Sequence, residues 1–375
     1  MQKPKLLFTP GPLTTSETVK QAMLRDLGSR DAEFLEIVSR IRRRLLELGN
    51  ASDGSYEAVL MQGSGTFAIE STISSMVPAT GKLLVAINGA YGRRMAKIAS
   101  VLRIPLREVV FPEAEPVEIT RVRDELAADP AVTHVATVHC ETSTGILNPV
   151  AELGRIVRQE GRAFIVDAMS SFGGIPVDVA ASGIDFLVSS ANKCIQGVPG
   201  FGFVLARRKL LAEAEGRARS LSLDLVAQWK GLEADGQFRF TPPTHALLAF
   251  SRALAELEAE GGVPGRAARY AANHRALMQG MERLGFDPYL PPEHRSHIIT
   301  AFRFPADVNF DFTEFYRQLS SLGFVIYPGK VSDANCFRIG TIGHIFPEDV
   351  QKLLAAIRGT LGEMRIDSAR SAACA

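Results

Sequence analysis

The stretch that decides the fold runs from residue 162 to residue 194 and reads RAFIVDAMSSFGGIPVDVAASGIDFLVSSANKC. It holds two short and mostly apolar runs, at residues 163–166 and 185–188. Strands that are buried on both faces have this continuous apolar pattern, so both runs are predicted as strands of a parallel sheet. Asp167 closes the first strand, and Lys193 follows the second. Both side chains are therefore expected at the carboxyl edge of the sheet, where open α/β folds bind ligands.

Similar apolar runs occur on both sides of this stretch and alternate with segments of helical spacing. They cover residues 56–61, 83–87, 108–111, 134–138 and 201–206. Strands that alternate with helices are typical of layered α/β proteins, in which helices cover both faces of the sheet. We therefore predict the α/β class, with a mostly parallel seven-stranded sheet between helices.

The clearest domain boundary is the run Gly-Gly-Val-Pro-Gly at residues 261–265. Shorter helix and strand patterns follow it and predict a small α+β domain. We predict a large domain with an N-terminal arm over residues 1–262 and a small C-terminal α+β domain over residues 263–363. Residues 364–375 contain mostly Ser, Ala and Arg and are predicted to be a flexible tail.

The 375 residues include 42 Lys and Arg against 41 Asp and Glu, which gives a net charge of +1. Binding of nucleic acid or anionic lipid favours clustered positive charge, so neither partner is predicted. No apolar run approaches the roughly 20 residues of a membrane span. His294 and His297 lack a third ligand at metal spacing, so no metal site is predicted. Scattered cysteines suit a reducing compartment and indicate a cytoplasmic protein: Cys140, Cys194, Cys336 and Cys374.

A Gly-Ser-Gly-Thr turn at residues 63–66 lies between the first predicted strand and a helix. Backbone N–H groups and two hydroxyls converge there at the positive end of the helix, which favours phosphate. Residues 63–68 also match the G-x-G-x-x-A dinucleotide fingerprint, but the next strand ends at Asn88 without the acid that would hold a ribose. A phosphate cup is therefore favoured, and a plain tight turn is the open alternative.

Lys193 lies among small polar residues, close to Ser190 and at the same predicted edge as Asp167. A lysine in such a pocket loses hydration, which lowers its pKa and lets its amine form a Schiff base. Each of the two charged residues alone could belong to a loop ion pair, and that alternative stays open. Together with a phosphate cup they indicate pyridoxal 5'-phosphate (PLP), with Lys for the aldehyde, Asp for the pyridinium nitrogen and a helix end for the phosphate.

Three further residues are candidates for the same site. Tyr91 follows the second strand and is placed either to stack on the pyridine ring or simply to pack in its loop. Thr144 belongs to residues 139–145, whose hydroxyls are candidates for lining the ring. Arg338 lies between apolar neighbours on a predicted strand, where a substrate anion or an internal salt bridge would pair its charge.

The chain resembles the class V aminotransferases, a family of PLP-dependent enzymes of fold type I, from residue 7 to about residue 360. The resemblance is carried by long strings: LFTPGPLTT at residues 7–15, DAMSSFGGIP at 167–176, SSANKCIQGVPG at 189–200, SLSLDL at 220–225, FRFTPPTH at 238–245 and FVIYPGKV at 324–331. One departure is Tyr91, which stands where related enzymes often have tryptophan.

The resemblance implies that PLP is the cofactor, that Lys193 bonds its aldehyde and that Asp167 pairs with its pyridine nitrogen. It also implies a set of phosphate ligands: Ser64, Gly65, Thr66 and Thr241. Thr241 would reach across from the other subunit of a homodimer, and Arg338 would bind the substrate anion. With the residues named above, the predicted cofactor site also includes Tyr91, Thr144 and Ser190.

The implied reaction moves the amino group of 2-aminoethylphosphonate to pyruvate and gives phosphonoacetaldehyde and L-alanine, in phosphonate degradation. The alternative is another small-substrate transaminase of the same class, of the alanine or serine to glyoxylate or pyruvate type. The chemistry would be the same, and the donor pocket would differ.

Overall fold

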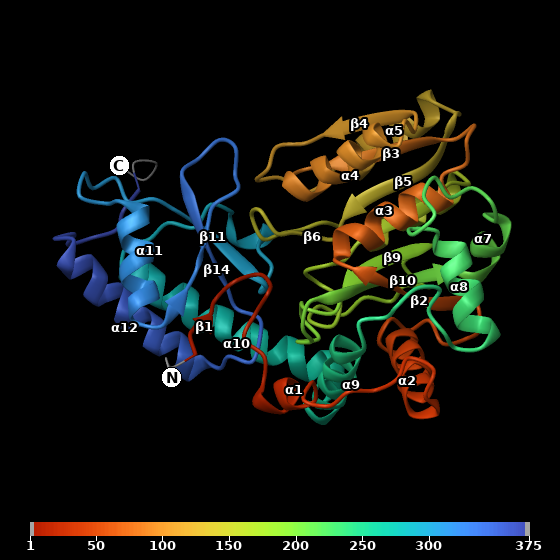
Figure 1. Ribbon diagram of the computed structural model, residues 1–375. Coiled ribbons are helices and arrows are strands. Elements are labelled where there is room, and N and C mark those ends of the chain that lie inside the picture. Colours follow the sequence, from red (N-terminus) through yellow and green to blue (C-terminus); the bar gives the residue numbers. More distant parts are fainter. Residues whose placement is uncertain (1–3, 372–375) are drawn as a thin grey trace.

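The computed structural model describes residues 4–371, and its larger part is built on a seven-stranded sheet (Figure 1). The strand order is β2-β10-β9-β8-β5-β3-β4. The strands are β2 (Tyr56–Gly63), β3 (Lys82–Ile87), β4 (Leu106–Val110), β5 (Val132–Val138), β8 (Ala163–Asp167), β9 (Phe186–Ser190) and β10 (Gly200–Arg207). β10 is antiparallel to both of its neighbours, and the other adjacent pairs are parallel. The predicted α/β class and mostly parallel seven-stranded sheet are confirmed.

Helices pack on the sheet because each has one apolar side. α3 packs against β2, β9 and β10, α4 against β3, and α6 against β8. In α2, the residues that recur at helical spacing are all buried: Phe34, Ile37, Val38, Ile41 and Leu45. The helices of this part are α2 (Ala32–Leu48), α3 (Gly65–Met76), α4 (Ala90–Val101), α5 (Ile119–Ala128), α6 (Val150–Gln159), α7 (Arg208–Glu213), α8 (Leu225–Ala234) and α9 (Thr244–Ala259).

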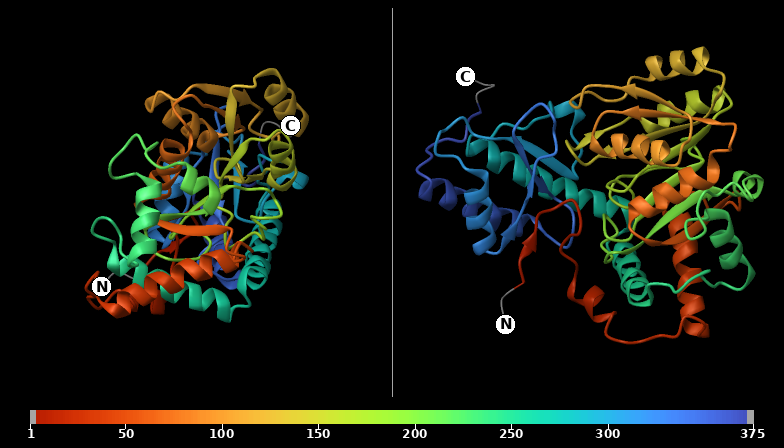
Figure 2. Two further views of the ribbon diagram at one scale, coloured as in Figure 1. Left: turned by 90° about the vertical axis from the view of Figure 1, so that its right-hand side faces the viewer. Right: turned by 45° about the horizontal axis from the view of Figure 1, so that its top comes forward.

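The smaller part is built on a three-stranded antiparallel sheet of order β11-β14-β13. Its strands are β11 (Ile299–Arg303), β13 (Tyr327–Pro328) and β14 (Cys336–Gly340), and its helices are α11 (Phe312–Ser321) and α12 (Pro347–Glu363). The long helix α10 (Gly262–Arg283) runs from the larger part to the smaller one, as the two further views show (Figure 2). Each part has its own hydrophobic cluster of buried residues.

The N-terminal arm packs on the smaller part, although the sequence groups it with the large domain. β1 (Leu6–Leu7) pairs in parallel with β12 (Phe324–Val325), and Phe8 is buried in the hydrophobic cluster of the smaller part. The arm therefore crosses from one part to the other. The remaining short elements are α1 (Glu17–Gln21), β6 (Cys140–Glu141), β7 (Ile146–Leu147) and a 3-10 turn (Pro292–His294). The domain limits given above, residues 1–262 and 263–363, remain a prediction.

The segment after α12 differs from the flexible tail that the sequence predicts. Ile366 and Ala369 are buried in the hydrophobic cluster of the smaller part. The backbone N–H of Ser371 donates a 2.8 Å hydrogen bond to Asp287 Oδ2. Residues 364–371 are thus packed, because two apolar side chains and the backbone find partners near the end of α10. Residues 372–375, including Cys374, lie outside the described residues.

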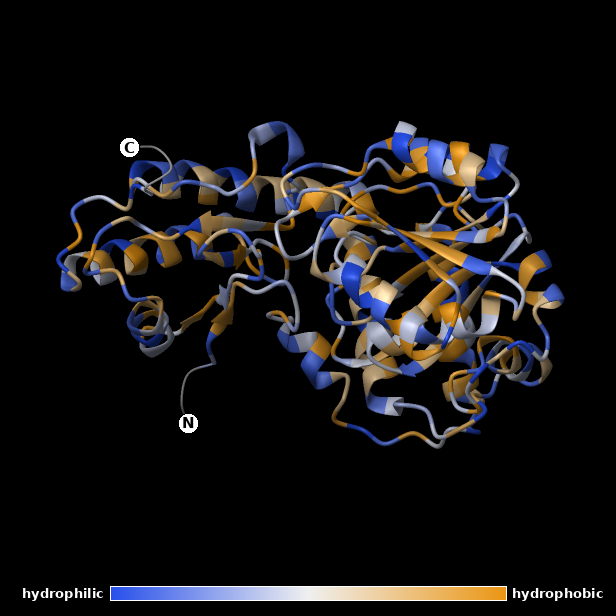
Figure 3. Cartoon of the chain, turned by 90° about the horizontal axis from the view of Figure 1, so that it is seen from above, coloured by the Kyte–Doolittle hydropathy of each residue, from blue (hydrophilic) through white to orange (hydrophobic). Residues whose placement is uncertain are grey.

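Hydropathy follows this architecture, with hydrophobic residues concentrated in the strands of the central sheet (Figure 3). The helices alternate hydrophobic and hydrophilic residues along their length, as amphipathic helices do (Figure 3). Within residues 4–371, no helix is both long enough and apolar enough to cross a membrane.

Candidate active site

A cavity of about 190 Å³ opens at the carboxyl edge of the central sheet, where the ends of β8 and β9 lie side by side. Parallel α/β sheets bind ligands at this edge. Seven of the predicted site residues line the cavity, and seven further residues complete its wall. The lining is Ser64, Gly65, Thr66, Ile69, Tyr91, Arg94, Met95, Thr142, Asp167, Met169, Ser170, Ser190, Asn192 and Lys193.

Lys193 lies in the turn after β9, and its Nζ donates a 2.7 Å hydrogen bond to the carbonyl oxygen of Pro10. Gly11 allows this approach: it has a φ of +118°, and a Cβ atom there would stand 2.9 Å from Nζ. Burial lowers the pKa of Lys193 to about 8. A large fraction of the amine is therefore neutral near that pH, as a nucleophile requires.

Asp167 ends β8 and is buried at the cavity. Its Oδ1 accepts a 2.9 Å hydrogen bond from the backbone N–H of Met169. Burial raises the pKa of this carboxyl to about 6, while the positive charge of Lys193 acts in the opposite direction. Within residues 4–371 neither Asp167 nor Lys193 forms an ion pair, which argues against the simple loop pair that the sequence leaves open.

Helix α3 begins at the cavity with Ser64 as its N-cap. The Ser64 hydroxyl makes no capping bond, and Phe67 is the first residue of the helix whose backbone N–H bonds to the preceding turn. In the described chain the N–H groups of Gly65 and Thr66 are left without acceptors. Arg94 donates a 3.2 Å bond to Thr66 Oγ1 and adds positive charge. Free N–H groups at a helix N-terminus bind anions, which favours the phosphate cup over the plain turn.

Tyr91 lies in the first turn of α4, which the buried Glu141 of β6 holds in place. The Glu141 carboxylate accepts hydrogen bonds from the backbone N–H groups of Tyr91, at 3.1 Å, and Gly92, at 3.2 Å. It therefore caps α4 at its positive end. The Arg94 guanidinium lies 4.6 Å from the centroid of the Tyr91 ring, within the range of a cation–π contact. Glu141 thus positions both Tyr91 and the helix that carries Arg94.

Arg338 of β14 is only 2% exposed. Its Nε donates to the carbonyl oxygen of Pro328 at 3.0 Å, and its Nη1 donates to that of Thr142, a lining residue, at 2.9 Å. No carboxylate among residues 4–371 forms an ion pair with it, so the internal salt bridge that the sequence leaves open is not found. A buried guanidinium without a counter-charge is costly, and a bound substrate anion would offset that cost.

Three predicted residues do not line the cavity: Arg338, described above, Thr144 and Thr241. Thr144 is buried, and its hydroxyl accepts a 3.2 Å hydrogen bond from the backbone N–H of Ile146 within the β6–β7 turn. Thr142 of the same turn takes a place in the wall instead. Thr241 is exposed, and among residues 4–371 it is bonded only through its carbonyl oxygen, by Gln62 Nε2 at 3.3 Å.

The sequence analysis missed three polar or charged residues of the wall: Arg94, Ser170 and Asn192. One signal was present for Arg94, because it follows Tyr91 by three residues on a predicted helix, and such residues share a face. Thr142 and Ser170 hydrogen-bond to each other at 2.7 Å, although they are far apart in the sequence. Only the folded chain reveals that contact.

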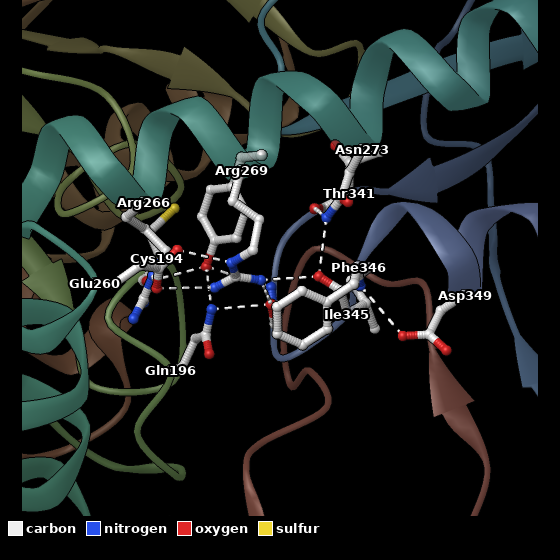
Figure 4. A network of polar contacts seen from close by, with 12 residues as sticks. Cys194, Gln196, Glu260, Arg266, Arg269, Asn273, Thr341, Ile345, Phe346 and Asp349 are labelled. Atoms are coloured by element: carbon white, nitrogen blue, oxygen red, sulfur yellow. Dashed lines mark hydrogen bonds and ion pairs between the residues drawn. The ribbon is translucent and has the colours of Figure 1, made fainter.

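A network of polar contacts from α10 holds the segment after Lys193 (Figure 4). The buried Arg266 donates a 2.6 Å hydrogen bond from Nη1 to the carbonyl oxygen of Cys194, and the Tyr270 hydroxyl donates to the same oxygen at 3.0 Å. Gln196 Nε2 donates to the Tyr270 hydroxyl at 2.6 Å and to the carbonyl oxygen of Gly343 at 2.9 Å. The turn that carries Lys193 is thereby fixed to both parts of the molecule.

These residues fit PLP. The free N–H groups at the start of α3 suit its phosphate, the buried Asp167 suits its ring N–H, and the partly neutral Lys193 suits its aldehyde. Among residues 4–371 no group of three or more His, Cys, Asp or Glu side chains is placed to hold a metal ion.

Comparison with known proteins relates this arrangement to a large family. The sequence pattern of the family Aminotransferase class-V matches residues 14–317. The chain is 56% identical to a 2-aminoethylphosphonate–pyruvate transaminase of Syntrophobacter fumaroxidans, over 96% of this chain and 97% of that protein. It is 54% identical to a protein of the same name from Vibrio cholerae, over 96% of this chain and 98% of the other.

Solved structures agree in fold. An alanine–glyoxylate aminotransferase from Nostoc sp. superposes with a TM-score of 0.89, with 25% identity and coverage of 96% of both chains. A pyridoxamine–pyruvate aminotransferase from Mesorhizobium loti superposes with a TM-score of 0.88, with 24% identity and coverage of 97% of this chain and 93% of the other.

Proposed function

The chain belongs to the class V aminotransferases, and we propose that it transfers the amino group of 2-aminoethylphosphonate to pyruvate, giving phosphonoacetaldehyde and L-alanine in phosphonate degradation. The choice of substrates is supported by one observation. The chain is more than 50% identical, over nearly its whole length, to proteins named 2-aminoethylphosphonate–pyruvate transaminase. The cofactor is PLP. We also propose that the enzyme acts in the cytoplasm, since Cys140, Cys194 and Cys336 are free thiols.

Each role rests on a contact described above. When bound, PLP supplies an aldehyde for the substrate amine and a ring that withdraws electrons from the adjacent C–H bond. Asp167 keeps a proton on the ring nitrogen, and the start of α3 binds the phosphate. The Lys193 amine accepts the proton from the substrate carbon as a general base. Arg338 orients the substrate by its anion, which both the donor and pyruvate carry.

A panel of amino donors tests this function directly. Purified holoenzyme with pyruvate should form L-alanine fastest from 2-aminoethylphosphonate, with a lower kcat/KM for β-alanine. Ethylamine, which lacks the anion, should be poorer by up to about 10⁴-fold, because it leaves the polar site unpaired. A kcat/KM ratio near one between 2-aminoethylphosphonate and β-alanine would leave only a class V transaminase of another specificity. Alanine and serine with glyoxylate, run in parallel, would identify it.

Asp167→Asn should retain the fold and some bound cofactor but lose at least tenfold in kcat. The substitution removes the charge that holds the proton on the ring nitrogen, and each unit by which that pKa falls costs a factor of ten. Initial rates across a pH series would measure the loss. Asp129→Asn is the matched control, because Asp129 pairs with Lys82 outside the cavity. Unchanged activity in Asp167→Asn would assign the carboxyl a structural role.

We also propose that the active enzyme is a homodimer in which Thr241 of one subunit reaches the cofactor phosphate of the other. Three large apolar side chains near this segment are exposed in the single chain: Phe67 at 50%, Leu221 at 77% and Phe240 at 45%. They belong to adjoining segments, since Gln62 bonds to the carbonyl oxygen of Phe240 and Arg239 bonds to that of Leu221. Exposed apolar patches of this kind mark interfaces.

Thr241→Ala should weaken cofactor binding about fivefold, or about 1 kcal/mol, the effect of one hydrogen bond. Equilibrium dialysis against PLP would measure the change. In the wild-type enzyme, cofactor loss should increase on dilution as subunits separate. Retention of the cofactor in a sample shown by ultracentrifugation to be monomeric would contradict the role of the second subunit.

A further inference from the structure

The proposed donor and acceptor differ in charge, and the inference below rests on that proposed function. Pyruvate and alanine present a carboxylate with one negative charge and two planar oxygens. A phosphonate presents three tetrahedral oxygens, and like a phosphate monoester it carries close to two negative charges above neutral pH. Arg338 supplies one positive charge to either ligand. A site that prefers the dianion needs a second cation beside Arg338.

Two cations lie over the Tyr91 ring at the cavity, and a third, Arg338, interacts with the same side chain. Lys330 Nζ lies 5.3 Å from the ring centroid, and the Arg94 guanidinium lies 4.6 Å from it. Lys330 and Arg338 belong to the same hairpin, since Lys330 follows β13 and Tyr327 of β13 is paired with Arg338 of β14.

None of the three cations forms an ion pair among residues 4–371. After burial, the main causes that lower the pKa of Lys330 are the positive charges of Arg338 and Arg94. The nearby Glu141 acts in the opposite direction, but its oxygens are occupied by the N–H groups of Tyr91, Gly92 and Ser143. The cations therefore repel one another, and a dianion placed between them would relieve that repulsion.

Two acids that belong to the hairpin loop or contact it, Asp333 and Glu113, are also occupied. Glu113 accepts a 2.8 Å hydrogen bond from the backbone N–H of Ser332, which ties the hairpin loop to the larger part. Asp333 accepts hydrogen bonds from the Tyr289 hydroxyl at 2.9 and 3.0 Å. Gly329 continues the hairpin through a 2.8 Å bond from its N–H to the carbonyl oxygen of Cys336. The loop is thus anchored on both sides of Lys330, and within residues 4–371 the Lys330 ammonium group forms no hydrogen bond or ion pair.

Arg94 is assigned to the other end of the cavity, because it bonds to Thr66 at the phosphate-binding start of α3. Lys330 has no hydrogen-bond partner among the described residues and lies on the side of Arg338. We propose that Lys330 and Arg338 form a two-cation subsite for the phosphonate group, and that Lys330 sets the preference for a dianionic phosphonate over a carboxylate.

The test compares two unreactive ligands that differ in their anion, ethylphosphonate and propionate. Isothermal titration calorimetry of the holoenzyme at about pH 8 would measure both dissociation constants without turnover. The wild type should bind ethylphosphonate more tightly than propionate. Lys330→Gln should reduce that preference about tenfold, the effect of one charge-assisted hydrogen bond, and Lys330→Arg should keep most of it. Lys97→Gln, an exposed lysine on α4, is the matched control and should change nothing.

Two outcomes would overturn the inference: equal binding of the two ligands by the wild type, or an unchanged preference in Lys330→Gln. The donor panel separates this result from the proposed function. A preference for ethylphosphonate that depends on Lys330 supports the subsite even where 2-aminoethylphosphonate is not turned over, an outcome that would refute the proposed reaction. Turnover of 2-aminoethylphosphonate with a preference that is independent of Lys330 would refute the subsite alone.

Discussion

Lys193→Ala is expected to lower alanine formation by at least about 10⁴-fold and to remove the absorbance of the Schiff base between Lys193 and the cofactor. Among the described residues Lys193 is the only lysine in the lining of the cavity, and burial lowers its pKa to about 8, so that its amine is available to bond the aldehyde. The substitution removes the nucleophile and the general base together, and general acid–base catalysis alone contributes up to about 10⁴-fold. Coupled assay of L-alanine and an absorbance spectrum would measure both effects.

Lys193→Arg separates this chemical role from a structural one. The guanidinium keeps the positive charge and can still donate to the carbonyl oxygen of Pro10, but it stays protonated and cannot bond an aldehyde. We expect it to be as inactive as Lys193→Ala, with an unfolding midpoint close to that of the wild type. Retained Schiff-base absorbance in Lys193→Ala, or restored turnover in Lys193→Arg, would contradict the assignment.

The central sheet could be predicted from sequence because its strands are buried on both faces. Burial on both faces requires continuous apolar runs, and short runs such as residues 163–166 and 185–188 are visible without any structure. The same runs place Asp167 and Lys193 at one edge, because parallel strands end together there. These two positions follow from topology alone, so they required no knowledge of side-chain contacts.

Details that depend on one turn could not be predicted in this way. Thr142 and Thr144 are two residues apart in the same turn, and both are buried. The Thr144 hydroxyl is occupied by the N–H of Ile146, whereas Thr142 lines the cavity. The outcome is set by the backbone path between β6 and β7, which short-range sequence patterns do not fix. The packing of residues 364–371 is similar, because it depends on a surface that the distant end of α10 provides.

Arg94 and Lys330 were missed for a different reason. Charged residues on a helix or in a loop are usually solvated, and composition offers no signal that distinguishes these two from the other 40 Lys and Arg residues of the chain. Their significance comes from convergence on Tyr91, which brings together α4 and the hairpin of β13 and β14. Arg338 was easier to find, because a charge between apolar neighbours on a strand is unusual.

Arg338→Lys is expected to lower kcat/KM about 100-fold in both half-reactions, with donor and with pyruvate. The side chain now bonds two carbonyl oxygens, of Pro328 and Thr142, and three of its five N–H groups bond to neither of them. A lysine keeps one point charge but cannot hold those carbonyls and bind two substrate oxygens at once. Loss of two charge-assisted bonds at about 1.5 kcal/mol each corresponds to roughly 100-fold.

Single-turnover measurements, with cofactor absorbance as the signal, would follow each half-reaction separately. If one site serves both anions, the two rate constants should fall by similar factors in Arg338→Lys. Lys330→Gln should by contrast affect 2-aminoethylphosphonate more than alanine, because only the phosphonate carries the second charge. A loss confined to one half-reaction in Arg338→Lys would show that donor and acceptor anions use different partners, and the sharing of a single guanidinium would have to be abandoned.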